Sequence, residues 1–281
     1  MFIDAHYHPE TWELICPDEE TAKMRRKSMN MPKTSIKTME GILIQMDVIG
    51  LDKVCIFAKD YHSADGFVCV SNEDIAKIVN AYPDKFIGIA SVDPNDPDHL
   101  EKAEHAFRDL GLKGLKLHPG RQAFFPSDPK LEPLYQLCEK YDKPIVFHAG
   151  LSLEKNCETK YSNPLEFEPV ALKHPNLRMC LCHMGWPWVR ETAMLMLKYR
   201  NVYADTSVLY MDSAGEFLKQ VLTVDIPWTW VDRSLRHQIM FGSNGPRFEQ
   251  RRLAIAFDQL PLRDETKELI KSTNAIEFFK L

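Results

Sequence analysis

The stretch Phe2-Ile3-Asp4-Ala5-His6-Tyr7-His8 decides the fold class, because it predicts a buried strand that ends in two histidines. Successive side chains of a β-strand point to opposite faces, so a period of two separates the polar residues from the apolar ones. This period places Asp4, His6 and His8 on one face of the strand. We therefore searched the rest of the chain for further strands that end in polar residues.

Seven further apolar runs of similar length follow the first predicted strand, which spans Phe2–His6. They are Lys53–Ala58, Phe86–Val92, Gly114–His118, Pro144–His148, Arg178–His183, Val202–Thr206 and Gln238–Ser243. The runs are spaced by roughly 25 to 50 residues, which leaves room for a helix after each strand. The pattern predicts a repeated strand–helix unit.

Segments with helical periodicity separate the predicted strands. The clearest contains Ile36, Met39 and Met46 and ends at Gly50, which suits the residue after a helix C-terminus. The others are Asn72–Ala81, Asp98–Leu110, Leu131–Tyr141, Trp188–Tyr199 and Arg247–Leu260. This alternation fits both an open, doubly wound α/β sheet and a closed (β/α)₈ TIM barrel. The count of eight strands, and the absence of a Gly-x-Gly-x-x-Gly turn after the first, favour the barrel.

The length and composition predict one domain that spans residues 1–281. Two connections, near residues 9–35 and 209–237, are longer than a strand–helix unit needs, so we expect insertions at the barrel rim. Hydrophobic residues make up 44% and charged residues 27% of the chain, as in soluble globular proteins. The net charge of −5 predicts no nucleic-acid partner.

The sequence also predicts a cytoplasmic protein with no membrane partner. No apolar run approaches the roughly 20 residues of a membrane span, and the N-terminus lacks the pattern of a signal peptide. The seven cysteines are scattered and mostly lie in apolar runs, which is typical of reduced thiols in a protein core. Cys180 and Cys182 precede His183, but no second cysteine pair completes a zinc ribbon.

The histidines gather at the carboxyl ends of the predicted strands. His6 and His8, His148 and His183 follow strands one, five and six, and His118 ends strand four. In a barrel these strand ends meet on one face, where active sites of this fold are built. Neutral imidazoles are good ligands for a divalent metal, so we expect one metal ion, with zinc as the preferred identity.

The order of several short motifs resembles the amidohydrolase-related metal-dependent hydrolases. This branch of the amidohydrolase superfamily includes decarboxylases of aminocarboxymuconate semialdehyde and of hydroxybenzoates. The resemblance spans the whole chain and rests on Asp-Ala-His-Tyr-His (4–8), Gly-Leu-Lys-Leu-His-Pro (114–119), Phe-His-Ala-Gly (147–150), Cys-His-Met-Gly (182–185), Tyr-Ala-Asp-Thr-Ser (203–207) and Phe-Gly-Ser-Asn (241–244).

The resemblance implies the roles of the candidate metal and catalytic residues. It makes His6, His8 and His148 the metal ligands, and it makes His183 the residue that orients or deprotonates a metal-bound water. The family carries an aspartate at the position of Asn244, as a metal ligand or an acid/base. An asparagine side chain cannot take up a proton near neutral pH, although its oxygen can still act as a weak ligand.

Lys116 and His118 are candidate substrate-binding residues. They are two positions apart on the fourth strand and therefore share a face. Lys116 fits three roles: binding a substrate carboxylate, bridging two metals as a carbamate, or forming a structural ion pair inside the barrel. Asp205 fits either an acceptor for a ligand imidazole or the N-cap of the next helix.

We favour a metal-dependent hydrolase that opens an amide, ester or lactone bond with a metal-activated water. One alternative is a metal-dependent, non-oxidative decarboxylase of an aromatic or unsaturated carboxylic acid. The other is a metal-binding pseudoenzyme that lost turnover through Asn244. Each hypothesis predicts a small-molecule substrate or ligand, and a homodimer is compatible with the sequence.

Overall fold

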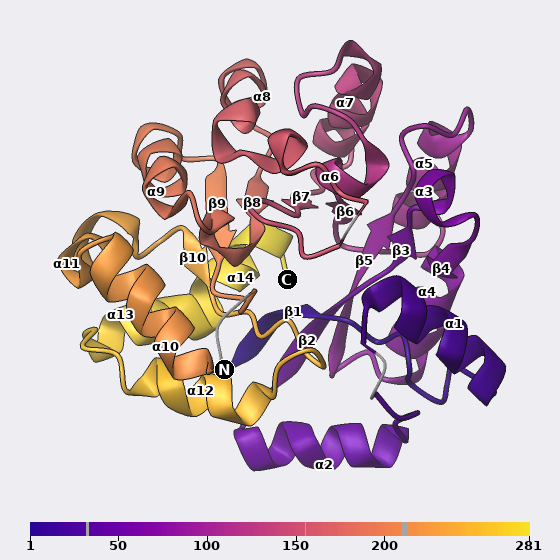
Figure 1. Ribbon diagram of the computed structural model, residues 1–281, viewed down its shortest axis with the longest axis horizontal. Helices are drawn as coiled ribbons and strands as arrows, with labels where there is room; N and C mark the ends of the chain where they lie inside the picture. The colour runs from indigo at the N-terminus through magenta and orange to yellow at the C-terminus, as the bar shows by residue number, and fades with distance from the viewer. Residues whose placement is uncertain (32–33, 155, 210–212) are drawn as a thin grey trace.

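Eight parallel strands form the centre of the computed structural model, which describes residues 1–31, 34–154, 156–209 and 213–281. Their order is β1-β2-β5-β6-β7-β8-β9-β10, so each strand pairs with the preceding and following strands of the series (Figure 1). The strands are β1 (Ile3–Tyr7), β2 (Lys53–Phe57), β5 (Phe86–Ser91), β6 (Leu115–Leu117), β7 (Ile145–Phe147), β8 (Met179–Leu181), β9 (Val202–Asp205) and β10 (Ile239–Met240). All eight predicted strands are present, most of them shortened at their ends.

The segment after β10 closes the sheet onto β1. The backbone N–H of Ala5 donates to the carbonyl of Phe241 at 2.8 Å, and that of Asn244 donates to the carbonyl of His6 at 2.9 Å. The backbone N–H of His8 extends this pairing, because it donates to the carbonyl of Gly245 at 2.8 Å. The sheet is therefore a closed barrel, and the predicted (β/α)₈ fold class is confirmed.

An irregularity in β1 corrects the predicted alternation of its side chains. Asp4 pairs with Val54 and Tyr7 pairs with Ile56, so three steps along β1 match two steps along β2. Such a bulge moves the residues after it to the other face. Asp4 accepts hydrogen bonds from Ser243 N–H and from the amide of Gln250 in the helical layer, so it does not share the face of His6.

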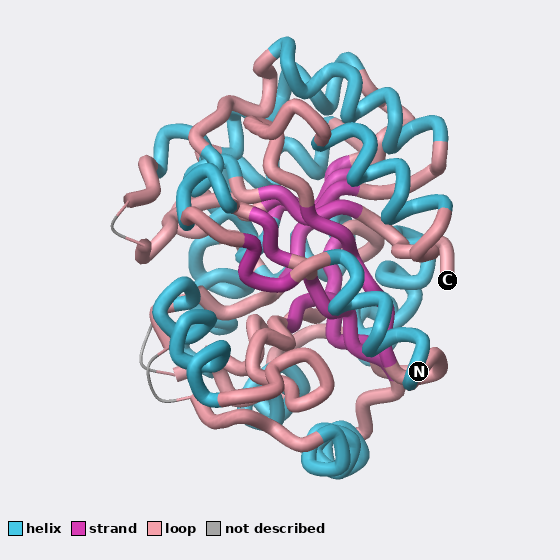
Figure 2. Tube along the Cα trace, turned by 90° about the vertical axis from the view of Figure 1, so that its right-hand side faces the viewer, coloured by secondary structure: helices cyan, strands magenta, loops and turns pink. Residues whose placement is uncertain are grey.

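Helices surround the barrel on the outside (Figures 1 and 2). They are α1 (Glu19–Met29), α2 (Met39–Ile49), α3 (His62–Asp65), α4 (Asn72–Ala81), α5 (His99–Arg108), α6 (Pro119–Gln122), α7 (Glu132–Lys140), α8 (Glu168–Lys173), α9 (Val189–Lys198), α10 (Ala214–Lys219), α11 (Trp228–Trp230), α12 (Gln250–Asp258), α13 (Asp264–Glu268) and α14 (Asn274–Phe279). The six helices expected from periodicity correspond to α2, α4, α5, α7, α9 and α12. Gly50 ends α2 with a left-handed φ of 80°, as its position predicted.

Two apolar clusters hold these layers together. The inner cluster joins residues of β1, β2, β5, β7, β8 and β10 that face one another across the barrel, such as Ile3, Phe57 and Ile89. Phe278 and Phe279 of α14 belong to the same cluster, so this helix closes one end of the barrel. Both chain termini lie at that end (Figures 1 and 2). The polar residues at the carboxyl ends of the strands lie at the opposite end.

The two long connections have different structures in their described parts. The first contains α1, whose last residue, Met29, reaches the cavity at the carboxyl ends of the strands. The second contains α10, α11 and two π-helical turns, η5 (Gln220–Asp225) and η6 (Val231–Leu235). This segment contacts α9 and α12 in the helical layer, and only Leu209 at its start lines the cavity among its described residues.

A small hairpin of β3 (Lys59–Asp60) and β4 (Val68–Val70), which the sequence did not predict, follows β2. Among the described residues, no helix combines the length and the apolar character that crossing a membrane requires.

Candidate metal centre

One cavity at the carboxyl ends of the strands brings together all seven predicted site residues: His6, His8, Lys116, His118, His148, His183 and Asn244. His6 belongs to β1, and His8 lies just beyond its end. His148 follows β7, and His183 follows β8 in the turn η4 (Cys182–Gly185) with a left-handed φ of 61°. The closed barrel thus gathers residues that are far apart in the chain.

His6 and His8 present two ring nitrogens to each other. Their Nε2 atoms are 3.3 Å apart, and His6 Nδ1 lies 2.8 Å from Oδ2 of Asp205. When Nδ1 of His6 donates its proton in a hydrogen bond to Asp205, the Nε2 atom of His6 carries a lone pair. A cation between the two Nε2 atoms would satisfy both, so this donor pair fits a divalent metal.

The two imidazoles differ in their tendency to take up a proton. Burial lowers the pKa of His6, but the nearby carboxylate of Asp205 outweighs it and raises the pKa to about 9. Burial lowers the pKa of His8 to about 4, against the attraction of Glu10. A proton at this pair is therefore held mainly by His6 and its carboxylate.

His148 and His183 form a second pair of imidazoles. Nε2 of His183 lies 3.2 Å from Nδ1 of His148, and the rings of His6 and His183 connect the two pairs with centroids 5.1 Å apart. Burial lowers the pKa of both His148 and His183, so both rings are neutral at neutral pH. A neutral ring can coordinate a metal or accept a proton.

Ser207 and Asp205 orient His183. Nδ1 of His183 lies 2.7 Å from the hydroxyl oxygen of Ser207, and Ser207 in turn donates to Asp205. The backbone N–H of His183 also donates to Asp205 at 2.8 Å. This chain places the proton of His183 on Nδ1 and leaves a lone pair on Nε2, which faces Nδ1 of His148 at 3.2 Å.

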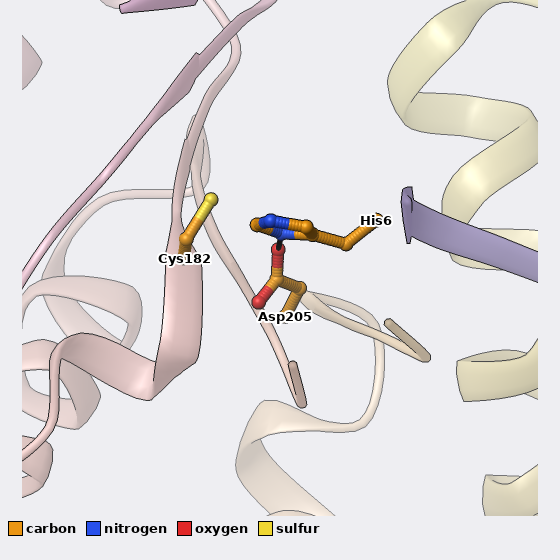
Figure 3. A group of neighbouring side chains, drawn as sticks. All are labelled: His6, Cys182 and Asp205. Carbon is orange, nitrogen blue, oxygen red and sulfur yellow. Dashed lines mark hydrogen bonds and ion pairs between the residues drawn. The ribbon is translucent and has the colours of Figure 1, made fainter. Parts of the chain in front are cut away.

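Asp205 connects both histidine pairs, as an acceptor for a ligand imidazole would. Figure 3 shows its carboxylate hydrogen-bonded to the His6 ring, with the sulfur of Cys182 directed toward the same ring. Burial would raise the pKa of Asp205, but His6 and its hydrogen bonds hold the pKa far below the ordinary value. The N-cap alternative is wrong, because Ser213 caps the next helix, α10.

The side chain of Lys116 is bound to other residues inside the barrel. Its ammonium donates to the sulfur of Cys182 at 3.0 Å and lies 5.0 Å from the centre of the Phe57 ring. Burial disfavours the thiolate of Cys182, but Cys180, Lys116 and His6 favour it and lower the pKa to about 6. This geometry favours the structural ion pair among the three roles expected for Lys116.

His118 and Asn244 have clear orientations at the cavity wall. The ring of His118 stacks on that of His148 with centroids 3.9 Å apart, and its Nδ1 accepts from the backbone N–H of Arg121 at 3.2 Å. Nε2 of His118 therefore carries the proton. Asn244 donates from Nδ2 to the carbonyl of Val208 at 2.8 Å, which leaves its side-chain oxygen for the cavity.

Several residues of the cavity wall escaped the sequence analysis. They are Met29, Lys59, Tyr61, Ser152, Leu153, Glu154, Leu209 and Arg247. Lys59 directly follows the predicted strand 53–58, so its strand-end position was an available signal. Arg121, which follows the motif at residues 114–119, forms ion pairs with Asp65 and Glu154.

A family profile described as Amidohydrolase matches residues 3–281 of the chain. The chain belongs to this family. This amidohydrolase is 22% identical over 305 residues to gamma-resorcylate decarboxylase of Rhizobium sp. (strain MTP-10005), and the alignment covers 94% of the chain and 92% of that relative. The family resemblance predicted from the motifs is thereby confirmed.

Two solved structures share the fold of this amidohydrolase. An uncharacterised TIM-barrel protein from Bordetella bronchiseptica has a TM-score of 0.76 at 20% identity, with 99% and 98% of the two chains covered. A dihydroxybenzoic acid decarboxylase from Polaromonas sp. JS666, with bound manganese and 2-nitroresorcinol, has a TM-score of 0.69 at 16% identity, with 100% and 97% covered. Manganese in this neighbour agrees with the expected divalent metal but not with zinc in particular.

Proposed function

We propose that this amidohydrolase is a metal-dependent, non-oxidative decarboxylase of an aromatic or unsaturated carboxylic acid. The whole-length similarity to gamma-resorcylate decarboxylase supports this choice over hydrolysis, which the sequence alone favoured. The observation that carries the proposal is which groups in the cavity wall can accept or donate a proton. Among its described lining residues, Glu154 is the one carboxylate, and Arg121 already pairs with it.

The two reactions need different numbers of proton transfers. Hydrolysis of an amide takes a proton from water and gives a proton to the leaving group. In decarboxylation the carbon–carboxylate bond breaks, CO₂ leaves, and the electron pair that remains on carbon takes up one proton. A cavity wall with a neutral Asn244, and with no unpaired carboxylate among its described residues, fits the second reaction better.

The residues of this chain divide the work between binding and proton transfer. His6, His8 and His148 would hold the metal, with the oxygen of Asn244 as a weak fourth donor. A divalent cation bound there would supply positive charge that holds a substrate carboxylate or phenolate. Nε2 of His183 faces the same space; it would take up one proton from solvent and give it to the carbon that loses CO₂.

Zinc stays the proposed ion, because the donor set consists of imidazoles and an amide oxygen, whereas manganese prefers carboxylates. Manganese is the alternative, since it is bound in the Polaromonas relative. The metal content of protein purified from medium with equal zinc and manganese decides between them.

The test is CO₂ release from a panel of hydroxybenzoic and unsaturated carboxylic acids, with zinc-loaded and manganese-loaded protein. A parallel panel of esters, amides and lactones is measured on the same preparations. CO₂ release with no hydrolysis is the expected result. Hydrolysis alone would overturn the proposal, and metal and ligand binding without any turnover would show a pseudoenzyme.

A further inference from the structure

Glu10 is a buried carboxylate next to the candidate metal ligands that the proposed chemistry does not use. Only 1% of the residue is exposed, and neither carboxylate oxygen has a hydrogen-bond partner among the described residues. Buried polar groups are almost always paired, because leaving a charged one unpaired is costly. An unpaired carboxylate at this place therefore requires an explanation.

Among the described residues, the side chain within ion-pair distance of Glu10 is the ring of His8. Oε1 of Glu10 lies 3.4 Å from Nδ1 of His8, and that nitrogen also lacks a hydrogen-bond partner. Among the described residues, no lysine or arginine lies within ion-pair distance of this carboxylate. A small rotation of either side chain would align the two unpaired atoms for a hydrogen bond.

The backbone keeps Glu10 in this position. Arg25 of α1 donates from Nη1 to the carbonyl of Glu10 at 3.1 Å and to that of Ile15 at 2.9 Å. Arg25 is itself paired with Asp74 at 2.9 Å. The segment after His8 is thus anchored to α1, and its carboxylate is directed to the back of the His8 ring.

Glu10 repeats on His8 the arrangement that Asp205 makes on His6. In each pair a buried carboxylate faces Nδ1, while the two Nε2 atoms face each other at 3.3 Å. A carboxylate behind a metal-binding imidazole fixes the tautomer and increases the basicity of the coordinating nitrogen. The difference between the pairs is that Glu10 is two residues from its histidine, whereas Asp205 comes from β9.

We propose that Glu10 is a positioning residue of the metal centre, which holds the Nδ1 proton of His8 and supplies the negative charge that Asn244 lacks. The direct donors, His6, His8, His148 and Asn244, are then all neutral, and the charge that balances the cation comes from Glu10 and Asp205 behind them. The inference rests on the metal centre of the proposed function and not on the reaction.

The experiment measures zinc affinity without substrate, by competition with a chromophoric chelator at fixed pH. Glu10→Gln keeps the shape of the side chain and removes its charge, so the dissociation constant should rise by about 10- to 100-fold. Glu13→Gln is the matched control: Glu13 lies on the same segment and accepts from the backbone N–H of Met39 at 2.7 Å. Its zinc affinity should stay within about twofold of wild type.

A double variant tests whether Glu10 replaces the charge missing at Asn244. Asn244→Asp restores a carboxylate beside the metal, so Glu10→Gln/Asn244→Asp should regain most of the affinity lost in Glu10→Gln. A second readout is the long-range ¹H–¹⁵N spectrum of the zinc-loaded protein. The Nδ1 proton of His8 should resonate downfield in wild type and move upfield in Glu10→Gln.

Wild-type affinity in Glu10→Gln, an equal loss in Glu13→Gln, or an unchanged His8 Nδ1 proton would each overturn the inference. Circular dichroism and the melting temperature of the metal-free variants exclude loss of the fold as the cause, and Glu10→Asp serves as the charged variant if Glu10→Gln does not fold. Decarboxylation can fail in its own assay while these metal-binding results hold, so the two proposals fail separately.

Discussion

Asn244 is held by a hydrogen bond that an aspartate could not make. Its Nδ2 donates to the carbonyl of Val208 at 2.8 Å, and a carboxylate oxygen at that place would face another oxygen. We expect Asn244→Asp to destabilise the metal-free protein by about 1–3 kcal/mol, the cost of a lost buried hydrogen bond. The same anion should tighten metal binding by about tenfold or more, because it faces the cation directly.

Calorimetric melting of metal-free and metal-loaded protein, together with chelator competition, measures both effects of Asn244→Asp. The melting temperature should fall without metal and recover with metal, by roughly 2–4 °C for each kcal/mol. The control is Asn156→Asp at an exposed position, which should change neither the melting temperature nor the metal affinity. Asn201→Asp is not suitable as a control, because Nδ2 of Asn201 donates to three carbonyls that would lose their donor. Unchanged metal affinity in Asn244→Asp would mean that residue 244 does not reach the ion.

His183→Ala should remove most of the activity and leave the metal content intact. The reason is that its Nδ1 is bound to Ser207, and its Nε2, which faces Nδ1 of His148, is assigned to proton transfer. A general acid or base contributes about 10² to 10⁴ in rate, so CO₂ release should fall by that factor. Ser207→Ala, which leaves the ring in place, should lower the rate less and broaden its pH dependence. Loss of the metal from His183→Ala would make His183 a ligand.

Helix α2 depends on a glycine whose role is conformational. Gly50 has a φ of 80°, and a Cβ atom there would meet no other atom within 4 Å. Gly50→Ala should therefore cost only the strain of a left-handed L-residue, about 1–2 kcal/mol, and lower the melting temperature by a few degrees. Gly215→Ala in α10 is the control, since its Cβ would make an ordinary contact 3.8 Å from Ala256, and it should not destabilise the protein. Equal melting temperatures for Gly50→Ala and wild type would contradict the prediction.

The metal centre should stabilise the whole barrel, because its proposed ligands come from β1, β7 and the segment after β10. A ligand that binds only the folded state stabilises it by about 2.7 kcal/mol at 100 times its dissociation constant. Metal loading should therefore raise the melting temperature by roughly 5–10 °C, and a chelator should reverse the change. The His6→Ala protein should show no such shift. A shift of equal size in His6→Ala would place the bound ion elsewhere.

The sequence by itself determined the barrel and seven of the residues that line its cavity. The periodicity of apolar residues is a local property, so the positions of all eight strands and of α2, α4, α5, α7, α9 and α12 followed from nearby residues. Histidines at strand ends needed only the rule that these ends meet on one face. Small helices such as α3 and α6, and the hairpin of β3 and β4, are too short for their periodicity to be detected.

Only the tertiary structure decided how the residues of the site are paired. The bulge in β1 depends on its register with β2, and it turned Asp4 away from His6. The partners of Lys116 and His183, Cys182 and Ser207, are 66 and 24 positions away in the chain. Such contacts depend on the closure of the barrel and on competition among buried charges, and neither leaves a signal in the local sequence. The position of Glu10 two residues after His8 is visible in the sequence, but its burial is not, because α1 and its Arg25 impose it.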